Sequence, residues 1–271
     1  MMSMEMFKVW SFLVVVTLGL LVCSSHGRAQ QDFDRERYYR AVEYCRGDVL
    51  RPLALSPDGQ VLCFDGEVAG DLDVSPARGL KENGLFVVRS PGGSSATAVE
   101  LAEIVGDHHA TVIVYDHCFS ACAVFFLIAS DQTYVLNGAL VTWHHLQERS
   151  AGSLCTYMTE PAEGRPKKVQ RGPCQTGGEL GANFWPDLAR FFGNRTIGSF
   201  DPPPDSLYVR RIIRNLYAET GVFPNIAWTL HPRNYPVLFK TKIFYEAYPQ
   251  SQEEVDVMAV RSGSGRVIYD P

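Results

Sequence analysis

The alternation of strand-like and helix-like segments between residues 58 and 145 constrains the fold more than any other feature of the sequence. Leu85–Arg89 is mostly apolar, and Thr111–Tyr115 is rich in β-branched residues, as a strand buried in a parallel sheet is. Between them, residues 96–105 place apolar side chains at helical spacing. Strand, helix and strand in this order imply right-handed βαβ crossovers. The sequence therefore predicts an α/β fold with a mostly parallel sheet.

The same patterns predict further elements along the chain. We expect helices over 34–46, 73–82, 96–105, 119–130, 181–192 and 223–230, and one from Asp205 or Ser206 to Thr220. We expect strands over 61–64, 85–89, 111–115, 132–136, 139–143 and 243–248. Residues 30–145 form the predicted α/β core, 146–180 a loop or hairpin insertion, and 181–271 a helical C-terminal part of the same domain.

The composition narrows the class of protein. The chain has 271 residues, of which 46% are hydrophobic and 20% charged, so it is neither mostly disordered nor collagen-like. It carries 25 Lys and Arg against 30 Asp and Glu, a net charge of −5. A nucleic-acid-binding protein needs a basic surface, so we expect no nucleic-acid partner.

The N-terminus has the pattern of a signal peptide over residues 1–29. Lys8 precedes an apolar run from Val9 to Val22, and Gly27 and Ala29 give the small-x-small spacing that signal peptidase reads. The alternatives are an uncleaved anchor, which would be the only membrane contact, and a lipoprotein at Cys23, which the bulky Val22 disfavours. We expect a periplasmic or secreted protein.

The cysteine count agrees with export. Of seven cysteines, one lies in the predicted signal peptide. An even set remains: Cys45, Cys63, Cys118, Cys122, Cys155 and Cys174. An even number in an exported chain suggests disulfides, and nearest-neighbour pairing (45–63, 118–122, 155–174) is the simplest arrangement, with free buried thiols as the alternative. Neither these spacings nor His108, His109 and His145 indicate a metal site, and we expect no metal and no cofactor.

Three short segments carry candidate chemistry. The first is Ser-Pro-Gly-Gly at 90–93, where Gly92 and Gly93 could expose backbone N–H groups as an oxyanion hole does; the alternative is an ordinary turn. The second is residues 118–123, where Ser120 and Ala121 stand at a strand-to-helix junction; here Ser120 could instead be a helix cap. The third is Thr-Trp-His-His at 142–145, which offers a general base or a structural histidine.

Together, the order of these segments resembles the ClpP/crotonase superfamily, and within it the Clp protease proteolytic subunit and the signal-peptide peptidases. A poorly characterised group of exported bacterial proteins with a Cys-x-Ser-Ala-Cys motif is also similar. The resemblance implies a spiral of ββα units with helices packed outside. It also implies that Ser120 is the nucleophile, that His144, 24 positions later, is the base, and that Gly93 and Ala121, beside Gly92, donate oxyanion N–H groups.

Two departures from that family pattern stand out. Cys118 and Cys122 flank the serine and are absent from the Clp subunit. The family's downstream Asp has no clear match; Asn234 could orient His144 as an amide does in other triads, and Asp201 and Asp205 are lower-ranked rivals.

The sequence thus predicts an exported serine hydrolase, a peptidase that acts through an acyl-enzyme on a peptide or protein substrate. The resemblance also implies a homo-oligomer. The alternative is a non-catalytic oligomeric binding or scaffold protein of the same fold. A third option, an acyl-CoA enzyme, is disfavoured because that cofactor is not expected outside the cytoplasm.

Overall fold

The computed structural model describes residues 34–47, 49–144, 154–159, 168–173, 184–198, 203–220 and 226–271. The chain divides into two units, residues 1–39 and 40–271. The described part of the first unit is the beginning of helix α2 (Arg35–Arg46). The second unit contains everything described below. Residues 1–29, and with them the predicted signal peptide, lie outside the described residues.

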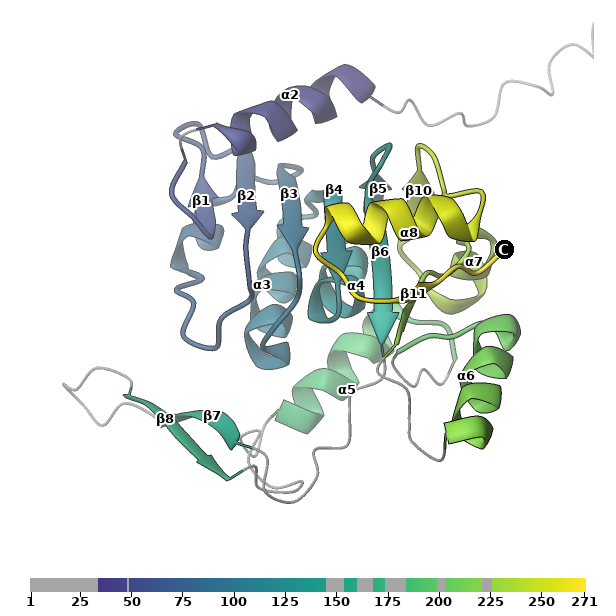
Figure 1. Cartoon of the computed structure of the whole chain (residues 1–271). Coiled ribbons are helices and arrows are strands. Elements are labelled where there is room, and N and C mark those ends of the chain that lie inside the picture. Colours follow the sequence, from purple (N-terminus) through teal and green to yellow (C-terminus); the bar gives the residue numbers. More distant parts are fainter. Residues whose placement is uncertain are drawn as a thin grey trace, which may run out of the picture. The chain divides into compact units, whose positions relative to one another are not determined.

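A nine-stranded mixed sheet organises the second unit, with the order β1-β2-β3-β4-β6-β9-β11 and with β5 and β10 attached beside β4 (Figure 1). Its strands are β1 (Leu53–Leu55), β2 (Val61–Asp65), β3 (Leu85–Ser90), β4 (Thr111–Phe119), β5 (Gln132–Val135), β6 (Leu140–His144), β9 (Ala227–Trp228), β10 (Lys242–Tyr245) and β11 (Val267–Ile268). Only the β1–β2 and β6–β9 pairs are antiparallel among these strands. The predicted α/β class with a mostly parallel sheet is confirmed.

Strand β4 changes partner halfway along its length. Val112–Val114 pair with β5, whereas His117–Phe119 pair with β6. Between the two halves, the register with β3 shifts and Asp116 adopts a φ of 60°. Such a bulge bends the strand and redirects its end. The sequence predicts a strand over 111–115, and the bulge lets it continue to Phe119, directly before Ser120.

Helices cover both faces of the sheet. On one face lie α3 (Ser95–Asp107) and the short α4 (Ala121–Phe125) with its 3₁₀ extension η2 (Phe126–Ile128), and on the other lies α8 (Gln252–Arg261) (Figure 1). The remaining helices are α5 (Phe184–Arg195), α6 (Leu207–Thr220), α7 (Tyr235–Leu238) and the 3₁₀ turns η1 (Ser75–Gly79) and η3 (Pro232–Asn234). Ser94 caps α3 by accepting a hydrogen bond from the Thr97 N–H, as the sequence suggests.

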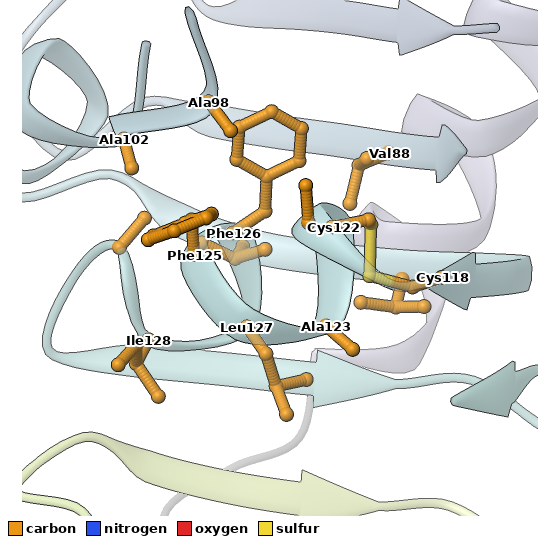
Figure 2. Close-up of a cluster of buried hydrophobic side chains, with 14 of the residues drawn as sticks. Val88, Ala98, Ala102, Cys118, Cys122, Ala123, Phe125, Phe126, Leu127 and Ile128 are labelled. Atoms are coloured by element: carbon orange, nitrogen blue, oxygen red, sulfur yellow. A yellow bond between two sulfur atoms is a disulfide. The ribbon is translucent and has the colours of Figure 1, made fainter. Parts of the chain in front are cut away.

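The centre of the core is a cluster of aromatic and aliphatic side chains between α3, α4 and the sheet (Figure 2). Phe126 is fully buried there, and its ring meets those of Phe64 and Phe86 edge-on at centroid distances of 5.5 and 5.3 Å. Ala98 and Ala102 of α3 lie beside it, where larger side chains would hold the helix away from the sheet. The small residues of α3 and the large residues of η2 therefore interlock.

Some predicted elements differ from the structure. The helix predicted over 73–82 is only the 3₁₀ turn η1, which begins at Ser75, has Pro76 in its first turn and ends at Gly79. The helix over 119–130 is shortened to α4 and η2. The helix over 223–230 is wrong: residues 223–225 lie outside the described part, and Ala227–Trp228 is strand β9. β9 is extended because β6 and β11 hydrogen-bond to its two edges.

Two of the three simplest disulfide pairings are present. Cys45 at the end of α2 bonds to Cys63 in β2, and Cys118 bonds to Cys122. Cys174 and the side chain of Cys155 lie outside the described residues. Two disulfides fit an exported protein. Within the described part of the chain, no helix is long and apolar enough to span a membrane.

The segment 146–180 contains an antiparallel hairpin of β7 (Leu154–Thr159) and β8 (Lys168–Pro173). This agrees with the hairpin alternative for the insertion. The backbone pairs Thr156 with Arg171 near the middle of the hairpin.

Replacing Phe126 tests the core. We expect Phe126→Ala to lower the free energy of unfolding by about 3–5 kcal/mol, because a fully buried ring is lost and the cavity cannot collapse against Phe64 and Phe86. Val260→Ala on α8, where the side chain is 79% exposed, should change it by about 0.5 kcal/mol or less. Urea denaturation of the three proteins measures both values, and equal losses would contradict the assigned core.

Candidate active site

Ser120 stands in a strained backbone conformation between β4 and α4. Its φ is 54° and its ψ is −123°, a region that a non-glycine residue occupies only at a cost of about 1–3 kcal/mol. Two hydrogen bonds hold the turn: the Ser120 N–H donates to the Thr142 carbonyl at 3.1 Å, and the Val124 N–H donates to the Ser120 carbonyl at 2.9 Å. A serine on a sharp strand-to-helix turn is the arrangement of a nucleophile elbow.

The hydroxyl of Ser120 is not used as a helix cap. Ser120 occupies the N-cap position of α4, yet its side chain makes no capping hydrogen bond. The side chain is also only partly buried. Ser120 therefore holds the N-cap position of α4 without a capping hydrogen bond from Oγ.

Gly92 lies directly against the Ser120 turn. Its φ is 90°, and a Cβ at this position would stand 2.6 Å from both the Ser120 Cβ and the Phe119 carbonyl oxygen. Gly93, at a φ of 140°, would place a Cβ 2.3 Å from the Val68 carbonyl oxygen. Both positions require glycine, because the loop after β3 passes between the backbone of Val68 and the backbone of the serine turn.

The N–H groups of this loop have different roles. The Gly92 N–H donates to Ser90 Oγ at 3.0 Å and is therefore already engaged. The Gly93 N–H and the Ala121 N–H have no acceptor among the described residues. An oxyanion hole requires unengaged backbone donors beside the nucleophile, and these two N–H groups belong to the loop and the turn that meet at Gly92 and Ser120. Gly92 instead contributes the close approach that brings the loop to Ser120.

His144 is the last residue of β6, and its side chain is partly buried. Strands β4 and β6 run parallel with Phe119 opposite Thr142, so Ser120, which follows β4, and His144, which ends β6, lie at the carboxyl ends of neighbouring strands. On its other side, His144 pairs with Ala227 of β9. The pairing of β4 with β6 thus brings the two predicted catalytic residues to the same edge of the sheet.

Asn234 lies in η3, within a hydrogen-bonded cluster around Asp270. Asp270 is 1% exposed; its carboxylate accepts from Ser206 Oγ at 2.6 Å, the His231 N–H at 2.9 Å and Asn234 Nδ2 at 3.2 Å. Sequence analysis missed Asp270, since nothing in its neighbourhood marks it as buried.

Of the rival third residues, Asp201 lies outside the described residues. Asp205 forms an ion pair with Arg210 of α6 at 2.5 Å. An arginine of the helix that follows Asp205 therefore already engages this carboxylate, and Asn234 remains the predicted third residue.

A second polar cluster surrounds the β4 bulge and was also missed. The Asp65 carboxylate accepts two hydrogen bonds from Arg89, one from Nε and one from Nη2, each at 2.7 Å. The Asp116 carboxylate accepts a hydrogen bond from His117 Nδ1 at 3.0 Å. Burial lowers the pKa of His117, although the hydrogen bond to Asp116 opposes this. Burial also raises the pKa of Tyr115, whose hydroxyl has no hydrogen-bond partner among the described residues. A sequence signal existed in the adjacent Asp116 and His117.

Metal-binding side chains do not gather within the described part of the chain, where no group of three His, Cys, Asp or Glu could hold an ion. His109 contacts Asp131 at 3.1 Å on the exposed surface. His145 lies outside the described residues.

Comparison with known proteins identifies no family for the chain. No protein-family model matches the chain, and no curated protein sequence matches it significantly.

The close approach at Gly92 predicts a specific cost of substitution. Gly92→Ala must displace the Ser120 turn, whereas the added Cβ of Gly198→Ala, at a φ of 70°, meets nothing within 4 Å among the described residues. We expect Gly198→Ala to lower the free energy of unfolding by about 1–2 kcal/mol, the backbone penalty alone, and Gly92→Ala to lower it by at least about twice that. Thermal unfolding of both variants measures the difference; equal values would contradict the contact.

Asp270 makes a second prediction for stability. Asp270→Ala leaves several buried donors without an acceptor, so we expect a loss of about 3 kcal/mol in the free energy of unfolding. Asp131→Ala, at a carboxylate that is 79% exposed, is the control and should change it by about 0.5 kcal/mol or less. Chemical denaturation distinguishes the two, and an Asp270 variant as stable as the control would overturn the cluster.

Proposed function

We propose that the protein is an exported serine hydrolase in which Ser120 is the nucleophile. The observation that carries the proposal is the Ser120 turn itself: a strained serine with an uncommitted hydroxyl, packed against a glycine loop with an uncommitted N–H. Strain of this kind persists where the surrounding structure enforces it, and it gathers at functional sites. A merely structural serine needs neither the strain nor the two glycines.

The proposed reaction gives each of these groups one role. Ser120 Oγ attacks a carbonyl carbon while His144 accepts the hydroxyl proton. The oxyanion that forms accepts hydrogen bonds from the N–H groups of Gly93 and Ala121. His144 returns the proton to the leaving group, and a water molecule then hydrolyses the acyl-enzyme by the same steps. Both N–H groups belong to backbone that is fixed on either side of the serine, so little reorganisation is needed.

Asn234 completes this proposal as the residue that orients His144. Because its Nδ2 donates to Asp270, the Oδ1 of the same amide remains as an acceptor. An amide oxygen that accepts from the imidazole keeps the other ring nitrogen available as a base, as in Cys-His-Asn sites. In this proposal Asp270 acts one step further away by holding the amide in that orientation.

The fold and the substrate belong to the same proposal. A parallel sheet, a glycine loop after β3 and a serine turn after β4 support the ClpP/crotonase-like spiral that the sequence resembles. That resemblance favours a peptide or protein substrate and a homo-oligomer. The two disulfides support a periplasmic or secreted location.

A fluorophosphonate probe tests the nucleophile directly. We expect the purified protein to be labelled covalently, and Ser120→Ala and His144→Ala to lose at least about 99% of the labelling rate, because the nucleophile or its base is removed. Ser75→Ala and His108→Ala, which replace the same residue types elsewhere in the fold, should be labelled like the wild type. The readout is fluorescence of the labelled chain against time.

Absence of labelling in the folded wild type would overturn the proposal. So would labelling that survives in Ser120→Ala. Either result would favour a non-catalytic binding protein that retains the fold.

A further inference from the structure

The Cys118–Cys122 disulfide encloses Ser120. Cys118 lies near the end of β4 and Cys122 in the first turn of α4, with a sequence separation of 4 and a distance of 5.2 Å between the two Cα atoms. Both side chains are fully buried (Figure 2). The bond therefore joins the strand that enters the serine turn to the helix that leaves it.

Besides the disulfide, two backbone hydrogen bonds restrain the serine turn: the Ser120 N–H donates to Thr142 and the Val124 N–H donates to the Ser120 carbonyl. Its strained φ is opposed by the ordinary preference of a serine for negative φ. The helix that follows has only five residues before it tightens into η2, so it offers little stability of its own. If Ser120 relaxed, both Oγ and the Ala121 N–H would rotate away from the glycine loop. A covalent link between the two arms of the turn limits that relaxation.

We propose that Cys118 and Cys122 are positioning residues, and that the hydrolase reaches full activity only when the disulfide between them is formed. This inference rests on the proposed function of Ser120. Opening the bond takes two electrons and two protons from a dithiol reductant, which becomes a disulfide, and leaves two thiols in the turn. Because both sulfur-bearing side chains are buried, an external reductant reaches them only when the turn opens.

The consequence is a link between location and activity. In a reducing compartment the two cysteines stay as thiols, and the serine turn lacks its clamp. After export to an oxidising compartment the bond forms as the chain folds. Replacing the two cysteines of a purely structural disulfide would lower only the stability of the fold. In this proposal, replacing Cys118 and Cys122 also lowers the reactivity of Ser120.

The second disulfide provides a matched control. Cys45 and Cys63 are equally buried, each at 1% exposure, and join α2 to β2 rather than the two sides of the serine turn. Removing either disulfide destabilises the fold, so a measurement of stability cannot distinguish a structural bond from one that positions Ser120. The labelling rate of the folded chains can distinguish them.

The experiment compares Cys118→Ala/Cys122→Ala with Cys45→Ala/Cys63→Ala in the full chain. Fluorophosphonate labelling gives the fraction of chains that react and the rate constant for those chains. We expect Cys118→Ala/Cys122→Ala to be labelled to the same final fraction but about 10- to 100-fold more slowly, because a displaced nucleophile reacts slowly. The control should keep the wild-type rate constant. Wild-type protein that is unfolded in urea, reduced with dithiothreitol, refolded in the reduced state and then reoxidised should recover its labelling rate constant.

A second readout separates this inference from the proposed function. Hydrogen exchange of the Ser120 amide, which donates to Thr142, should quicken at least tenfold in Cys118→Ala/Cys122→Ala and stay unchanged in the control. Wild-type rates of labelling and exchange in Cys118→Ala/Cys122→Ala would overturn the inference and leave Ser120 as the nucleophile. No labelling of the oxidised wild type would overturn both proposals.

Discussion

The backbones of Gly92 and Ser120 lie so close together that no side-chain atom fits between them, and the rest of the site depends on this contact. It exists because β3 and β4 are adjacent parallel strands whose carboxyl ends meet at one edge of the sheet. The bulge at Asp116 then carries β4 past that edge toward β6. As a result, the glycine loop after β3 and the serine turn after β4 meet beside strand β6.

Much of this arrangement is local in sequence and was therefore predictable. The alternation of buried strands with α3 follows from side-chain periodicity, and the helix cap at Ser94 from the residue type. The Ser-Pro-Gly-Gly segment stands out because only glycine tolerates both the positive φ and the close approach found at Gly92 and Gly93. The candidate serine and histidine are marked by position, each directly after an apolar strand.

What the sequence did not reveal depends on partners far along the chain. β9 is extended because β6 and β11 pair with it, although its residues resemble a short helix. Asp270 is buried because Ser206, His231 and Asn234 converge on it from other segments. The bulge in β4 has no marker in the residue pattern, since the exchange of β5 for β6 is decided by the sheet as a whole.

The shared strand β4 also sets the order in which the molecule can mature. When β4 has paired with β3 and β5, Val112–Val114 have all their strand partners. The segment from His117 to Phe119 still lacks its partner, β6. The acceptor for the Ser120 N–H is likewise a β6 carbonyl, that of Thr142. A partly folded chain therefore lacks the hydrogen bond that holds Ser120 in its strained conformation, so the serine turn is complete only after β6 has joined the sheet.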